Sequence, residues 1–74
     1  MEIIELHGKL FELDEFAPSN DDPLALECWD LSPNGELLFS VTRSAAGTLE
    51  LHPWGPAIPF ELFGLVQPHA ERFL

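Results

Sequence analysis

Two short turn sequences constrain the fold of this chain more than any other feature. Residues 32–35 read SPNG, in which proline suits the first central position of a type I turn and glycine suits the left-handed position that ends it. Residues 44–47 read SAAG and end in the same glycine. Each segment therefore predicts a three-residue hairpin loop closed by a bulge, and together they predict a three-stranded antiparallel meander.

These loops also set the register of the predicted meander. Ser32 would pair with Glu36 and Ser44 with Thr48, which gives strands at about residues 24–31, 36–43 and 48–54. Counting outward from the turns places apolar residues alone on one face, which we expect to be the core: Trp29, Leu31, Leu37, Phe39, Val41, Leu49 and Leu51. The other face receives Leu24, Leu26, Cys28, Leu38, Ser40, Thr42, Glu50, His52 and Trp54.

The flanking segments complete a small α+β fold. Residues 2–13 alternate apolar and charged side chains and predict a first strand, with a bulge near Gly8 or Lys9. Near the C-terminus, Pro68 should divide a helical pattern into two short helices, 59–66 and 68–73. The apolar stripe of that pattern is Phe60, Phe63, Val66, Ala70 and Phe73.

We therefore predict one domain over residues 1–74. Its sheet is a small antiparallel meander of about four strands. One or two short C-terminal helices pack on the apolar face of that sheet and give the fold two layers.

Charge is the most unusual property of the composition. The chain has 13 acidic residues against 3 lysines and arginines, for a formal net charge of −10. Residues 1–30 have a net charge of −8, whereas residues 31–74 have only −2. Because phosphate contacts need lysine and arginine, direct nucleic-acid binding is disfavoured, and so is binding to an anionic membrane. A basic protein partner is the natural complement.

The acidic side chains define the candidate binding surface. Residues 12–23, ELDEFAPSNDDP, contain five carboxylates and no base, and we expect an acidic loop there. Trp54 would lie beside an apolar area formed by Leu24, Leu26 and Cys28 and would anchor a partner. The predicted partner-binding residues are Glu12, Asp14, Glu15, Asp21, Asp22, Glu27, Asp30 and Trp54. A solvated acidic loop without a binding role is the alternative interpretation.

The sequence predicts neither a catalytic site nor a metal site. His7, His52 and His69 lack ligand spacing, and the acidic run lacks the glycine and closing glutamate of a calcium loop. The single cysteine, Cys28, excludes an internal disulfide and favours a packing role. We expect no enzyme activity, no metal and no cofactor.

These features together predict a small acidic, non-catalytic inhibitor that covers a basic surface of a protein, such as a nucleic-acid-binding toxin or complex. Immunity proteins against nucleases, antitoxins and phage-encoded inhibitors share this size and charge, which is an analogy of composition. The alternative is a homodimer or accessory subunit that assembles through an apolar sheet face or the exposed strand at 48–54. Because the sequence shows no basic leader and no long apolar run, we expect a cytoplasmic protein.

Overall fold

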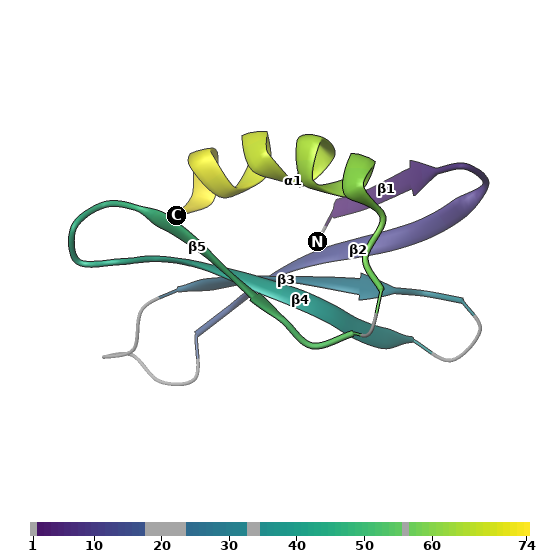
Figure 1. Cartoon of the computed structure of the whole chain (residues 1–74), viewed down its shortest axis with the longest axis horizontal. Helices are drawn as coiled ribbons and strands as arrows, with labels where there is room; N and C mark the ends of the chain where they lie inside the picture. The colour runs from purple at the N-terminus through teal and green to yellow at the C-terminus, as the bar shows by residue number, and fades with distance from the viewer. Residues whose placement is uncertain (1, 18–23, 33–34, 56) are drawn as a thin grey trace.

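The computed structural model describes residues 2–17, 24–32, 35–55 and 57–74. Within these ranges the chain forms five strands and one helix: β1 (Glu2–Leu6), β2 (Lys9–Phe16), β3 (Ala25–Asp30), β4 (Glu36–Arg43), β5 (Leu49–Pro53) and α1 (Phe60–Phe73). The strands form one antiparallel sheet in chain order, and α1 lies across one face of it (Figure 1). The predicted α+β meander is confirmed, with one more strand than expected and a single helix.

The additional strand results from a tight turn at His7 and Gly8. Both residues have positive φ, 51° and 79°, which is the conformation of a two-residue type I′ hairpin turn. Leu6 pairs with Lys9 across this turn, so the chain reverses direction there. The predicted continuous strand over residues 2–13, with a bulge near Gly8, is therefore wrong.

Of the two predicted loops in the meander, the second has the predicted register and the first does not. The Ser44 N–H donates to the Thr48 carbonyl at 2.8 Å, as the SAAG turn predicted. At the first loop Asp30, not Ser32, pairs with Glu36. The Ser32 N–H instead donates to Oδ1 of Asp30 at 3.0 Å, a local bond that competes with strand pairing.

A β-bulge then changes which side chains of β3 and β4 share a face. The register shifts between Cys28 and Trp29, so that Cys28 pairs with Phe39 and Leu38 becomes the extra residue. Because side chains alternate with a period of two, this shift turns Cys28 and Leu26 to the same face as Phe39. Their predicted place on the opposite face is wrong.

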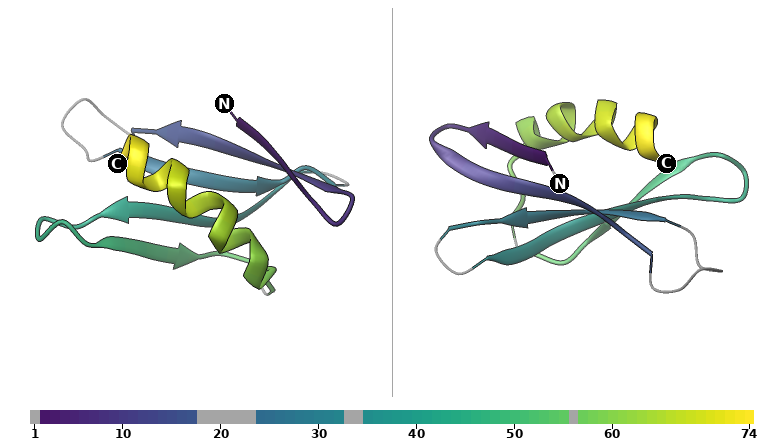
Figure 2. Two further views of the ribbon diagram at one scale, coloured as in Figure 1. Left: turned by 90° about the horizontal axis from the view of Figure 1, so that it is seen from above. Right: turned by 180° about the vertical axis from the view of Figure 1, so that it is seen from behind.

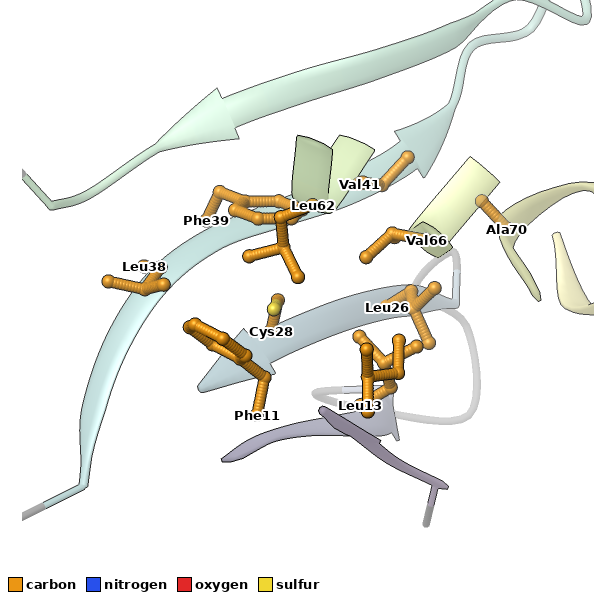
Figure 3. Packing of buried hydrophobic residues seen from close by; sticks show 11 residues of the cluster. Phe11, Leu13, Leu26, Cys28, Leu38, Phe39, Val41, Leu62, Val66 and Ala70 are labelled. Carbon is orange, nitrogen blue, oxygen red and sulfur yellow. The ribbon is translucent and has the colours of Figure 1, made fainter. Parts of the chain in front are cut away.

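The hydrophobic core lies between the sheet and α1 (Figure 3). Strands β1 to β4 and the helix all contribute to it. Its buried residues are Ile4, Phe11, Leu13, Leu26, Cys28, Leu38, Phe39, Val41, Leu62, Val66 and Ala70. Trp29 and Leu37, which were predicted to lie in the core, pair with each other on the other face, and Leu31 is exposed.

Helix α1 is continuous although it contains Pro68. A proline in a helix has no N–H, so the carbonyl of Gly64, one turn earlier, lacks its usual partner. Both residues are exposed, so water can satisfy that carbonyl. The buried residues of α1 lie on both sides of the proline and pack on the sheet: Leu62, Val66 and Ala70. The predicted division into two helices is therefore wrong.

The helix runs diagonally across the sheet (Figure 2). Its first turn follows Pro59, whose carbonyl accepts a hydrogen bond from the Leu62 N–H at 3.1 Å. Among the residues that the structure describes, no helix is long and apolar enough to cross a membrane.

Candidate binding surface

The face of the sheet opposite α1 is the candidate binding surface, and we call it the outer face. In the edge-on views of Figure 1 and Figure 2 (right), no described helix or strand covers it. Its residues follow from the strand register: Ile3, Glu5, Leu10, Glu12, Asp14, Phe16, Ala25, Glu27, Trp29, Leu37, Ser40, Thr42, Glu50 and His52. Trp54 follows directly after β5 on this side.

Three carboxylates form what we call the acidic centre of the outer face: Glu12, Asp14 and Glu27. Glu12 and Asp14 are alternate residues of β2, and Asp14 lies directly opposite Glu27 on β3. Like charges in directly opposed positions of an antiparallel pair destabilise the sheet. The acidic centre therefore destabilises the fold slightly, so stability does not explain why its three carboxylates lie together.

The Asp14 carboxylate also affects the protonation of Glu12. The Asp14 side chain raises the pKa of Glu12, because a hydrogen bond between the two carboxyl groups favours the protonated form of Glu12. Desolvation and the negative charge of Asp14 act in the same direction. A lysine or arginine placed against this pair would oppose the effect, since a positive charge favours the ionised form of Glu12.

Apolar side chains surround the acidic centre. Trp54 is 66% exposed, and its Nε1–H donates to Oγ of Ser40 at 3.4 Å. Ser40 pairs with Glu27, so this hydrogen bond places the indole beside the acidic centre. The other large exposed apolar residues of the outer face are Ile3, Leu10 and Phe16. Exposed aromatic and aliphatic groups next to charges are typical of protein interfaces.

The structure divides the predicted binding residues between the two faces of the sheet. Glu12, Asp14, Glu27 and Trp54 come together on the outer face. Glu15 lies on the other side, opposite Leu26 and next to His69 of α1. Glu12, Asp14 and Glu15 are part of β2, so the prediction of a loop beginning at residue 12 is wrong. Asp21 and Asp22 lie outside the described residues.

The negative charge of Asp30 is compensated by Lys9 of the same chain. Asp30 is only 9% exposed, on the helix side of the sheet, and its Oδ2 lies 3.2 Å from Nζ of Lys9. The hydrogen bond from the Ser32 N–H, and then the contact with Lys9, lower the pKa of Asp30. Its charge therefore stabilises the fold, and a partner would have to compete with these contacts for it.

This arrangement makes the stability of the fold depend on pH. A carboxyl with a lowered pKa in the folded state adds stability above its unfolded pKa of about 3.9, and the gain is lost as pH falls through the folded value. We expect Asp30→Asn to lower the free energy of unfolding by about 1 to 2 kcal/mol at pH 7 and by a smaller amount at pH 2.

Urea denaturation followed by circular dichroism at both pH values measures this difference. Glu36→Gln is the matched control. Glu36 is the exposed cross-strand neighbour of Asp30, and its substitution removes the same charge. An equal loss of stability in both variants would contradict the role of the Lys9 and Ser32 contacts.

Cys28 packs in the hydrophobic core. Cys28 is completely buried, and burial, with a smaller effect of the Asp30 charge, raises the pKa of its thiol to about 12. It is therefore a protonated packing group at neutral pH. Within the described ranges, no three His, Cys, Asp or Glu side chains are grouped so that they could hold a metal ion.

Several outer-face residues were missed in the sequence interpretation, namely Ile3, Leu10, Phe16, Trp29 and Leu37. The His7-Gly8 dipeptide between two alternating segments was the available signal for the first two, because glycine there allows a tight hairpin turn. The bulge at Cys28 and Trp29 has no comparable local signal.

Comparisons of the chain with protein-family models, with curated proteins and with solved structures gave no match. The chemistry of the outer face is therefore what bears on function.

Proposed function

We propose that this chain is a small, acidic, non-catalytic binding protein that covers a basic surface of a protein partner with its outer face. The observation that carries the proposal is the meeting of the acidic centre and exposed apolar side chains on the one sheet face that α1 leaves uncovered. If the covered surface normally binds phosphate groups, the protein acts as an inhibitor, as immunity proteins and antitoxins do.

The opposed carboxylates support a functional interpretation of the acidic centre. Asp14 and Glu27 face each other across two strands, and Glu12 is the next residue on the same face of β2. This arrangement weakens a fold that is already small, so it favours an external cation as its counterpart. A solvated face would need no such concentration of charge in the middle of a sheet.

The chemistry of the outer face favours arginine and lysine side chains in the partner. A carboxylate pair accepts a guanidinium in a bidentate arrangement, and desolvation strengthens such a contact. The exposed ring of Trp54 beside the acidic centre offers a cation–π contact to the same kind of group. The apolar side chains around the acidic centre would be buried by a protein surface but not by a small cation, so they favour a protein as the partner.

The alternative of two outer faces packed on each other is disfavoured. A two-fold axis through the acidic centre would place the acidic centre of one copy against that of the other. Like charges brought together in this way cost several kcal/mol.

Capture of the partner with immobilised protein tests the proposal. The triple variant Glu12→Gln/Asp14→Asn/Glu27→Gln removes the acidic centre with little change in shape. Its matched control, Glu36→Gln/Glu61→Gln/Glu71→Gln, removes the same charge at exposed positions outside the acidic centre.

We expect the wild-type chain and the control to retain one basic protein from an extract of the native host. The triple variant should lose that protein, and about 0.5 M salt should release it from the wild-type chain, because the Debye length then shortens to about 4 Å. Equal recovery with all three proteins would remove the acidic centre from the proposal.

A further inference from the structure

The free edge of β5 presents backbone groups that can pair with another strand. The Ser44 N–H bonds to the Thr48 carbonyl, and the Trp54 N–H bonds to the Leu38 carbonyl at 2.8 Å. Antiparallel strands alternate hydrogen-bonded and non-bonded pairs, so the even-numbered residues of β5 direct their backbone groups toward β4. The N–H and C=O groups of Leu49 and Leu51 therefore point to the outside of the sheet.

An apolar groove runs beside this edge, between β5 and α1. It has a volume of about 210 Å³, and Leu51 is 41% exposed at its margin. Its lining residues include Leu49, Leu51, Phe63 and Val66. An exposed edge strand next to apolar side chains is a surface on which a further strand can pair and bury them.

We propose that β5 pairs antiparallel with β5 of a second copy of this chain, with Leu51 at the two-fold axis. Leu51 then faces Leu51 of the second copy, and each donates its N–H to the carbonyl of the other. Leu49 faces Pro53 of the second copy and donates its N–H to the Pro53 carbonyl. Since Pro53 has no N–H, the ladder ends there, and the interface has a defined length.

The same register brings unlike side chains together on the outer face. Glu50 of each copy faces His52 of the other, in a non-bonded pair, where the side chains approach most closely. The His52 ring is already held by a 2.9 Å hydrogen bond between its Nε2 and Oγ1 of Thr42, which leaves Nδ1 to bond the carboxylate. The β5 sequence is thus complementary to itself about Leu51.

The high negative charge of the chain does not prevent this dimer. The acidic centre lies on β2 and β3, two to three strand spacings from β5, or about 10 to 14 Å. The two acidic centres would therefore be more than about 20 Å apart, well beyond the physiological Debye length of about 8 Å.

The edge of β1 offers no comparable arrangement. Glu2 and Glu5 lie in this five-residue strand, and it contains no base. Self-pairing of β1 would therefore bring carboxylates together with nothing to offset them.

The dimer would be a continuous sheet across the two-fold axis. Antiparallel edge pairing keeps facing side chains on one side, so both helices lie on one side and both outer faces on the other. The interface uses none of the acidic centre, so it stands independently of the proposed partner.

Sedimentation equilibrium of the full chain over about 1 μM to 1 mM tests the pairing. We expect a monomer–dimer equilibrium whose Kd rises about 30-fold or more in Leu51→Pro, because two inter-chain hydrogen bonds are lost. A proline is tolerated there in the monomer, since the N–H points away from the sheet. Ile3→Pro is the matched control, because its N–H points outward from the β1 edge and should not affect Kd.

A charge exchange provides the second measurement if Leu51→Pro does not fold. His52→Glu places two carboxylates opposite each other and should raise Kd about tenfold, and adding Glu50→Lys should restore it. A chain that stays monomeric at 1 mM overturns the proposal. So does a dimer that Leu51→Pro leaves intact, or one that the double variant does not restore.

Discussion

Replacing Phe39 with alanine is expected to lower the free energy of unfolding by about 3 to 5 kcal/mol. Phe39 is completely buried on β4, and its ring lies 5.5 Å from that of Phe63 in α1, so the cavity would open between the sheet and the helix. A domain of this size has on the order of 5 kcal/mol of stability in total. The variant should therefore be largely unfolded near 37 °C.

Phe60→Ala is the control for this prediction. Phe60 belongs to the apolar stripe that the sequence predicted for the buried face of the helix, yet it is 82% exposed. Its replacement should cost less than about 1 kcal/mol. Urea denaturation measures both values. If Phe60→Ala were as costly as Phe39→Ala, Leu62, Val66 and Ala70 could not be the side of α1 that packs on the sheet.

The β4–β5 hairpin could be predicted because the interactions that form its turn are entirely local. Gly47 has a φ of 90°, and its N–H donates to the Ser44 carbonyl at 2.9 Å. The Thr48 N–H donates to Oγ of Ser44 at 3.1 Å, so one serine supports both ends of the turn. Turn residues of this kind determine the register without help from the rest of the molecule.

The β1–β2 hairpin was missed because histidine is an unusual residue at the first central position of its turn. The type I′ turn needs positive φ at both central residues, which asparagine and glycine adopt most readily. His7 adopts a φ of 51° there, and the alternation on either side had suggested one long strand. Because that strand was expected to end at about Leu13, Asp14 was expected in a loop, and its position on β2 could not be predicted.

The composition of the outer face could not be predicted for a different reason. The bulge between Cys28 and Trp29 exchanges the faces of β3, because one extra residue reverses the alternation. Trp29 is larger than Cys28 and better suited to a core by size alone, but the core beneath α1 accommodates the smaller side chain. Which of the two residues is buried depends on tertiary packing, which the alternation of the local sequence does not reveal.

Helix continuity across Pro68 is also a tertiary effect. A proline inside a helix costs about 3 kcal/mol in isolation, which is why two helices were expected. Burial of Leu62, Val66 and Ala70 against the sheet offsets this cost along the whole length of α1. The proline also lies on the exposed side, where its missing hydrogen bond is least costly.

Trp54→Ala is expected to weaken binding of the captured partner by about 30- to 1,000-fold. Truncation of an interface tryptophan usually costs much binding energy, because its large ring is desolvated by the partner. The fold should be nearly unaffected. The side chain is 66% exposed, and the backbone bonds from Trp54 and Gly55 to the Leu38 carbonyl remain in the variant.

Titration calorimetry or surface plasmon resonance with the purified partner measures the change, and Phe60→Ala is again the control. Phe60 is an aromatic residue on the helix side that is even more exposed than Trp54, so its removal should leave the affinity unchanged. Substitution of Trp54 should mainly raise the dissociation rate, whereas amides in the acidic centre should mainly lower the association rate at low salt. If Phe60→Ala weakened binding and Trp54→Ala did not, the partner would bind the helix side, and the carboxylates of the outer face would serve only solubility.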